Sequence, residues 1–134
     1  MTTRGINNGS PHYGIRSIRS ENFKFIWNLT PEAKFVNACV KSPEFQSWKT
    51  VNTPEAKALV KRYQHRPKEE FYDIVNDPLE LNNLADDPHY HDQIATLRAK
   101  LKAWMHECGD EGQTTELKAL ERMGKNRKKK KPKK

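Results

Sequence analysis

The sequence predicts an α+β fold in which a small antiparallel sheet packs against a long C-terminal amphipathic helix. Short helices are expected between the strands, and a disordered basic tail at the end. Three features favour this fold: an alternating apolar strand near the start, a stripe of apolar residues at helical spacing near the end, and a final polylysine run. A chain of 134 residues is long enough for one domain. We expect that domain to cover residues 1–124 and the tail to cover 125–134.

The first predicted elements form a β-hairpin. Residues 1–12 are rich in Gly, Asn, Ser and Thr and are expected to be irregular. Strands are expected at 13–19 and 23–29, joined by a turn at 20–22. On the second strand one face carries Phe23, Phe25, Trp27 and Leu29. Three aromatic side chains on one face require a covering element.

Short helices are expected between residues 30 and 66. Three segments repeat a Ser or Thr cap followed by Pro and Glu, starting at Thr30, Ser42 and Thr53. The hydroxyl can accept from free amides, and Pro suits the first helical position. The first of the three could instead be a loop. Few apolar residues fall on each turn, so we expect these helices to lie on the surface.

The second half of the chain predicts one more strand and the longest helix. Residues 69–75 form the strand candidate, ended by the turn signal at 76–78. Asp86 or Asp87 supplies the cap of the helix, Gly109 supplies its stop, and a further short helix is expected within 113–123. The apolar stripe of the long helix consists of Tyr90, Ile94, Leu97, Leu101, Trp104, Met105 and Cys108.

The positive charge is confined to the tail. The chain carries 25 Lys and Arg against 17 Asp and Glu, and eight of the basic residues lie in the last ten positions. Residues 1–124 therefore have no net charge, which argues against a basic nucleic-acid-binding fold. No apolar run is long enough for a transmembrane helix, and the first residues resemble no secretory signal, so localisation stays open.

Neither cysteine has neighbours that point to chemistry. Cys39 and Cys108 lack a base or further ligand at a useful spacing, so both are expected to be buried structural residues. Asn28 begins a glycosylation sequon, but Pro31 and the missing signal argue against its use.

Two polar clusters could hold a metal or act as acids. His89 and His91 with Asp87 and Asp92 resemble a metal set, but they lie at a helix start where capping residues are expected. We expect Glu107, Asp110 and Glu111 to face water near the helix end. We therefore assign no catalytic, cofactor-binding or metal-binding residue in this chain.

One segment is distinctive. Residues 69–88, EEFYDIVNDPLELNNLADDP, resemble the C-terminal signature of the sulfatase family, where Glu-Leu-Tyr-Asp-Leu runs into Asp-Pro-x-Glu-x-x-Asn-Leu-Ala before a long final helix. The strand pair at 13–19 and 23–29 is also similar to that family. The 42–46 segment and Trp104 resemble more narrowly its sulfamidase (N-sulfoglucosamine sulfohydrolase) branch. The resemblance covers about residues 2–123.

The resemblance implies a hydrolase of sulfate esters or sulfamates. Full-length family members use calcium and a formylglycine made within Cys/Ser-x-Pro-Ser/Ala-x-Arg. Cys39 has its proline at the fourth following position instead of the second, and Cys108 has none nearby. We therefore expect no cofactor in this chain, which would be a C-terminal subdomain without the catalytic domain. Its implied role is structural and cleft-walling, and alone it should be inactive.

The implied partner is a sulfatase catalytic domain, missing or separately encoded; the family is commonly exported or lysosomal. We expect an apolar docking surface on the second sheet face, with Ile15, Ile26 and Tyr72, and self-association of the chain through it. The alternative is an independent binding module whose basic tail meets anionic partners such as sulfated glycan or, less favoured, nucleic acid.

Overall fold

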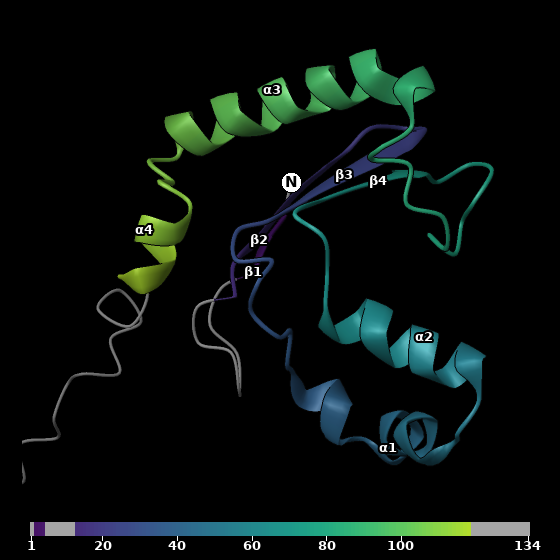
Figure 1. The fold of residues 1–134 in the computed structure, drawn as a ribbon. Coiled ribbons are helices and arrows are strands. Elements are labelled where there is room, and N and C mark those ends of the chain that lie inside the picture. Colours follow the sequence, from purple (N-terminus) through teal and green to yellow (C-terminus); the bar gives the residue numbers. More distant parts are fainter. Residues whose placement is uncertain (1, 5–12, 119–134) are drawn as a thin grey trace, which may run out of the picture.

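The computed structural model describes residues 2–4 and 13–118, and it has the expected α+β architecture (Figure 1). The second half of the expected 113–123 helix and the whole polylysine tail lie outside the described residues. Every helix in the described ranges falls short of the length and apolar character needed to cross a membrane. The elements in chain order are β1 (Thr2–Arg4), β2 (Ile15–Arg19), β3 (Phe23–Asn28), the 3-10 helix η1 (Ala38–Lys41), α1 (Pro43–Thr50), α2 (Pro54–Gln64), β4 (Glu69–Asp73), the 3-10 helix η2 (Pro88–Tyr90), α3 (His91–Glu107) and α4 (Gln113–Leu117).

The four strands form one antiparallel sheet in the order β1-β2-β3-β4. The predicted hairpin is confirmed as β2 and β3, and the Ser20 amide donates to the Phe23 carbonyl at 2.8 Å across the turn. Phe25 lies opposite Ile18 on one side and Phe71 on the other. Because directly opposite residues share a face, this register gathers apolar side chains on one side of the sheet.

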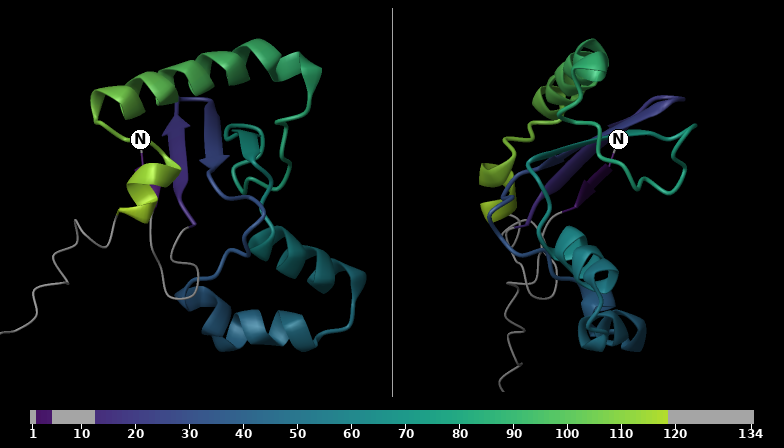
Figure 2. Two further views of the ribbon diagram at one scale, coloured as in Figure 1. Left: turned by 60° about the vertical axis from the view of Figure 1, so that its left-hand side comes forward. Right: turned by 45° about the vertical axis from the view of Figure 1, so that its right-hand side comes forward.

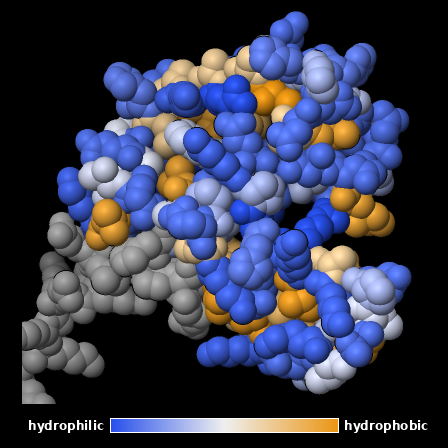
Figure 3. All heavy atoms as spheres, in the orientation of Figure 1, coloured by the Kyte–Doolittle hydropathy of each residue, from blue (hydrophilic) through white to orange (hydrophobic). Residues whose placement is uncertain are grey.

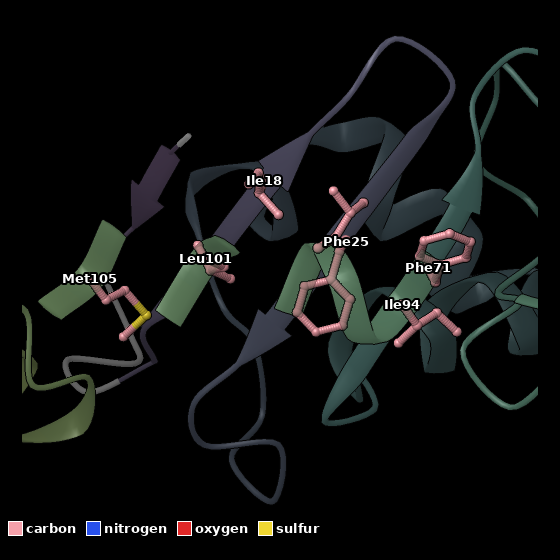
Figure 4. Packing of buried hydrophobic residues seen from close by; sticks show 7 residues of the cluster. Ile18, Phe25, Phe71, Ile94, Leu101 and Met105 are labelled. Carbon is pink, nitrogen blue, oxygen red and sulfur yellow. The ribbon is translucent and has the colours of Figure 1, made fainter. Parts of the chain in front are cut away.

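Helix α3 covers that apolar face, as Figures 1 and 2 show. Its stripe packs on the sheet as predicted, with Trp104 and Tyr90 half-buried at the margin. The stripe ends at Met105, because Cys108 caps the helix at an exposed position. The buried cluster consists of Ile18, Phe25, Phe71, Ile94, Leu97, Leu101 and Met105 (Figure 4).

The predicted helix caps are confirmed at two of three positions. The Ser42 hydroxyl accepts from the Phe45 amide and the Thr53 hydroxyl from the Ala56 amide, each at 3.3 Å. Residues 31–33, after Thr30, form a turn and a bend, so the loop alternative holds there. Gly109 ends α3 with a φ of +64°, which glycine adopts without strain.

Helices α1 and α2 do more than decorate the surface. Phe45 of α1 and Tyr63 of α2 meet at a ring-centroid distance of 5.0 Å, and Phe35 lies 5.7 Å from Tyr63 and 5.1 Å from Tyr13. Phe35, Phe45 and Tyr13 are buried. The helical pair therefore closes a second, aromatic core beside the sheet (Figure 2), which the expectation of purely superficial helices missed.

Candidate docking surface

The sequence signature forms the loop between β4 and η2, and Asn83 fixes this loop to the sheet. The Asn83 side-chain oxygen accepts from the Phe71 amide at 2.8 Å and from the Ala85 amide at 3.1 Å. Its amide group donates to the Glu69 carbonyl at 3.3 Å, and the Leu84 amide donates to the Phe71 carbonyl at 2.8 Å. The loop is thus hydrogen-bonded to the backbone of β4. Leu84 and Ala85 pack against the core cluster.

Two aspartates shape the turn inside this loop. The Asp73 carboxylate accepts from the amides of Asn76 at 3.0 Å and Val75 at 3.1 Å, and the Asp77 carboxylate accepts from the Asn82 amide at 2.7 Å. These backbone hydrogen bonds hold the pKa of both aspartates below its usual range. β4 ends at Asp73, two residues before the predicted end, because this carboxylate starts the turn.

Glu80 is held in an unusual conformation at the tip of the loop. Its φ is +54°, a left-handed conformation that costs a residue with a Cβ about 1–2 kcal/mol. Lys24 Nζ lies 2.8 Å and 2.9 Å from the two carboxylate oxygens of Glu80, and Arg62 donates to the Glu80 carbonyl. The strand β3 and the helix α2 therefore both hold this residue in place.

The constrained tip exposes apolar side chains. Leu79 is 74% exposed and Leu81 55%, and they line a groove of about 390 Å³ with Leu59 of α2, which is 44% exposed. We call Leu59, Leu79 and Leu81 the docking patch. Figure 3 shows apolar side chains around the hollow between the sheet and the α1–α2 pair. Single exposed leucines are common on monomers, whereas here three line one groove.

The prediction of an exposed docking surface formed by Ile15, Ile26 and Tyr72 was wrong, although Tyr72 lines the groove beside the docking patch. Ile26 and Tyr72 are buried and Ile15 is half-buried. Ile26 lies opposite Glu70 in the register, and the Tyr72 hydroxyl donates to Glu70 at 2.6 Å. This sheet face is therefore engaged by a charged network within the chain.

That network is centred on Glu70. Arg66 donates to its two carboxylate oxygens at 2.8 and 2.9 Å, and Asn28 donates to it at 2.7 Å. Burial would raise the pKa of Glu70, but the hydrogen bonds from Arg66, Tyr72 and Asn28 outweigh it and lower the pKa. Burial and the Glu70 charge raise the pKa of Tyr72. Asn28 is fully buried, so this packing leaves no room for a glycan on its side chain.

A second buried network joins β2 to the C-terminal end of α3. Arg16, only 1% exposed, donates to both Asp110 oxygens and pairs with Glu116 at 2.7 Å. Burial would raise the pKa of Asp110, but the hydrogen bonds from Arg16 and the Gly112 amide lower it. The expectation that Asp110 faces water was wrong, because it neutralises Arg16; Glu107 and Glu111 are exposed as expected.

The two cysteines and the His and Asp residues at the start of α3 do not come together into a site in the described residues. Cys39 and Cys108 are exposed, so the prediction that both are buried was wrong: Cys39 lies within the short helix η1, and Cys108 caps the end of α3. Asp87 caps η2 by accepting from the His89 amide at 2.9 Å, while His91 Nδ1 and Asp92 face solvent 3.6 Å apart.

Calcium, which full-length sulfatases use, is bound mainly by carboxylate and other oxygen ligands. Within residues 2–4 and 13–118, no three His, Cys, Asp or Glu side chains converge to hold a metal ion. The buried carboxylates Glu70, Asp110 and Glu116 are each engaged by an arginine of the chain itself.

Sequence reasoning missed Arg16, Arg66 and Glu70. Alternation along β2 places Arg16 on the same face as buried Ile18, and that signal could have identified Arg16 as a buried charge. No local pattern indicates its partners, because Asp110 lies 94 positions further along the chain.

Comparison with known proteins shows similarity to sulfatases. No family model matches the chain. It is similar to an ulvan-active sulfatase of Formosa agariphila, 29% identical over 116 residues, which are 81% of this chain and 19% of that protein. It is also similar to human N-sulphoglucosamine sulphohydrolase, 32% identical over 105 residues, which are 73% of this chain and 21% of that protein. The chain spans about a fifth of the length of these relatives. The signature segment packs against the sheet and precedes the long helix, and the chain is similar to about a fifth of these sulfatases, consistent with a C-terminal fragment of a sulfatase.

Proposed function

We propose that this chain is the structural, non-catalytic C-terminal part of a sulfatase, and that it packs against a catalytic domain and helps to wall the substrate cleft. The substrate class would be sulfate esters or sulfamates, since the names of the relatives refer to an ulvan-active sulfatase and an N-sulphoglucosamine sulphohydrolase. The observation that carries the proposal is the exposed docking patch, in which Leu79 and Leu81 lie on a constrained loop and Leu59 on α2.

The loop is built to present the patch. Asn83, Asp73 and Asp77 fix its backbone, and Lys24 and Arg62 hold Glu80 in a strained conformation. Local strain persists only where surrounding contacts maintain it, and it concentrates at functional positions. Here its result is that leucines on both sides of Glu80 point into solvent.

The occupant we propose for the patch is the remaining four-fifths of a sulfatase. The relatives align with this chain over only 19–21% of their own length, so in them a much larger part of the protein adjoins this region. Burying apolar side chains of this kind contributes about 25 cal/mol per Å² removed from water. In the isolated chain the same patch favours self-association.

A chimaera tests the docking. This chain would replace the homologous segment of the Formosa agariphila ulvan-active sulfatase, with Leu79→Asp/Leu81→Asp as the test variant. Leu117→Asp is the matched control, because Leu117 is 56% exposed on α4, away from the patch. We expect the double variant to lose soluble, active chimaera while the control retains it. Equal behaviour of the two variants would contradict the docking role.

The non-catalytic role has its own test. We expect the 134-residue chain alone to release no sulfate from an aryl sulfate or an N-sulfated glucosamine above a heat-treated sample. Turnover by pure protein would contradict this part of the proposal and leave the docking experiment unaffected.

A further inference from the structure

A second groove follows the other side of α2. It has a volume of about 350 Å³ and is lined by Trp48, Lys49, Lys57, Val60, Lys61, Gln64 and His65. We call it the basic groove. Lys57 and Lys61 lie one turn apart on the same side of α2, and His65, which caps the end of the helix, follows four positions later. Leu59 of the docking patch falls on a different side of α2, and Trp48 borders both grooves.

We propose that the basic groove binds a sulfated saccharide. That this saccharide is a polymeric substrate of the enzyme rests on the proposed function. Lys57 and Lys61 place cationic side chains about 6 Å apart along α2. A linear chain with repeated sulfate groups would meet one such side chain per helical turn, and Lys49 of α1 faces it from the other wall.

The lysines of the groove have no partner of their own. Within the part of the chain that the structure describes, neither Lys49, Lys57 nor Lys61 lies within 4 Å of a carboxylate oxygen. Like charges four residues apart destabilise a helix by a few tenths of a kcal/mol. A bound anion would remove that repulsion between Lys57 and Lys61.

Basic and acidic residues are also unevenly distributed along the chain, and the basic ones are concentrated in the segment that forms the groove. Residues 41–68 contain seven Lys or Arg and two Glu, whereas residues 69–97 contain eight Asp or Glu and no Lys or Arg. The helical pair is thus a positive region on a domain that carries no net charge over residues 1–124. Such a field attracts anions to α1 and α2 specifically.

Trp48 supplies the second contact that a sugar requires. Its indole is 41% exposed at the edge of the groove, and it packs against Phe45 at a centroid distance of 5.7 Å. The face of an indole is electron-rich, so it attracts the polarised C–H groups of a sugar ring as well as cations. An aromatic face beside lysines therefore complements a ring that carries sulfates.

The groove suits a saccharide better than a nucleic acid. Single-stranded nucleic acids bind along rows of aromatic side chains on which successive bases stack, and this groove offers one indole. Duplex DNA binding relies on a broadly basic body, whereas residues 1–124 are neutral overall. Nucleic acid is accordingly the competing outcome in the test.

The experiment measures binding of a dextran sulfate oligosaccharide to the full chain by calorimetry. All proteins carry glutamine in place of the eight basic residues of 125–134, so that the tail contributes no charge. The test variant is Lys57→Gln/Lys61→Gln, and the control is Lys34→Gln/Lys100→Gln, which removes two exposed lysines elsewhere. Thermal unfolding verifies that each variant is folded.

We expect the test variant to bind about tenfold more weakly, with the slope of log affinity against log salt reduced by about one for each lysine removed. The control should stay within about twofold of the reference. Trp48→Leu should weaken binding, whereas Trp48→Phe should retain it, because only phenylalanine keeps an aromatic face.

Three results would overturn the proposal. One is an equal loss in the test and control variants, and another is equal binding of unsulfated dextran. The third is equal or tighter binding of a single-stranded oligonucleotide of the same charge. Leu79→Asp/Leu81→Asp should bind dextran sulfate normally, so failure of the docking role and failure of the basic groove give separate readouts.

Discussion

Replacing Arg16 by methionine should cost this domain a large part of its stability. Arg16 lies between Asp110 and Glu116, and its side chain is 2% exposed, against 9% and 6% for the two carboxylates. Methionine keeps much of the volume but leaves two buried carboxylates without their cation. Removing one partner of a buried ion pair costs about 3–5 kcal/mol, within a total free energy of unfolding of about 5–15 kcal/mol for a typical domain.

The assay is urea unfolding at pH 7, with Arg19→Met as the control. Arg19 lies on the same strand but is exposed, so its replacement should change the free energy of unfolding by less than about 0.5 kcal/mol. The pKa of Asp110 is lowered in the folded protein, so its pairing stabilises the fold above the usual aspartate pKa and is lost as pH falls. The gap between Arg16→Met and the reference should therefore narrow in acid. A loss below about 1 kcal/mol that does not change with pH would refute the role given to this network.

Three further outcomes follow from the packing and the charges. Leu101→Ala, in the centre of the main core, should cost about 2–5 kcal/mol in urea unfolding, while Leu59→Ala in the docking patch should cost less than about 1 kcal/mol; similar losses would contradict the packing of α3. The pKa of Glu70 is lowered by its partners, so stability should fall as pH drops below the usual glutamate value, and Glu70→Gln should flatten this acid limb of the unfolding profile. Gly14→Ala would place a Cβ 2.6 Å from Glu116 Cγ and should cost about 1–3 kcal/mol; an unchanged thermal midpoint would show that the contact yields freely.

The sequence was sufficient for features that depend on neighbouring residues. Short-range periodicity predicts the β2–β3 hairpin and the apolar stripe of α3. The hydrogen-bonding preferences of Ser and Thr predict the caps at Ser42 and Thr53. How the signature segment holds its loop against the sheet could not be predicted from neighbouring residues. Its Asn83 acts through the backbone of Phe71, 12 positions earlier in the chain.

The features that sequence reasoning missed depend on distant pairs. Ile26 was expected in a docking surface, but it lies opposite Glu70, the centre of a buried network, which is 44 positions away in the chain. Cys108 fits the helical stripe by its spacing, yet it is the C-cap residue of α3, and its thiol is exposed. Periodicity shows which residues share a face, and only tertiary packing shows where the covering element stops.

The most direct test of the docking role is the accessibility of position 79 in the chimaeric sulfatase. With Cys39 and Cys108 replaced by serine, single cysteines would be introduced as Leu79→Cys and Leu117→Cys, and the rate of thiol labelling would be measured in the chimaera and in the isolated chain. Both positions are well exposed in the isolated chain, so both should react rapidly there. The account predicts that position 79 becomes about tenfold or more slower in the chimaera while position 117 does not, because only the docking patch meets the catalytic domain. Equal labelling of position 79 in the chimaera and in the isolated chain would contradict it.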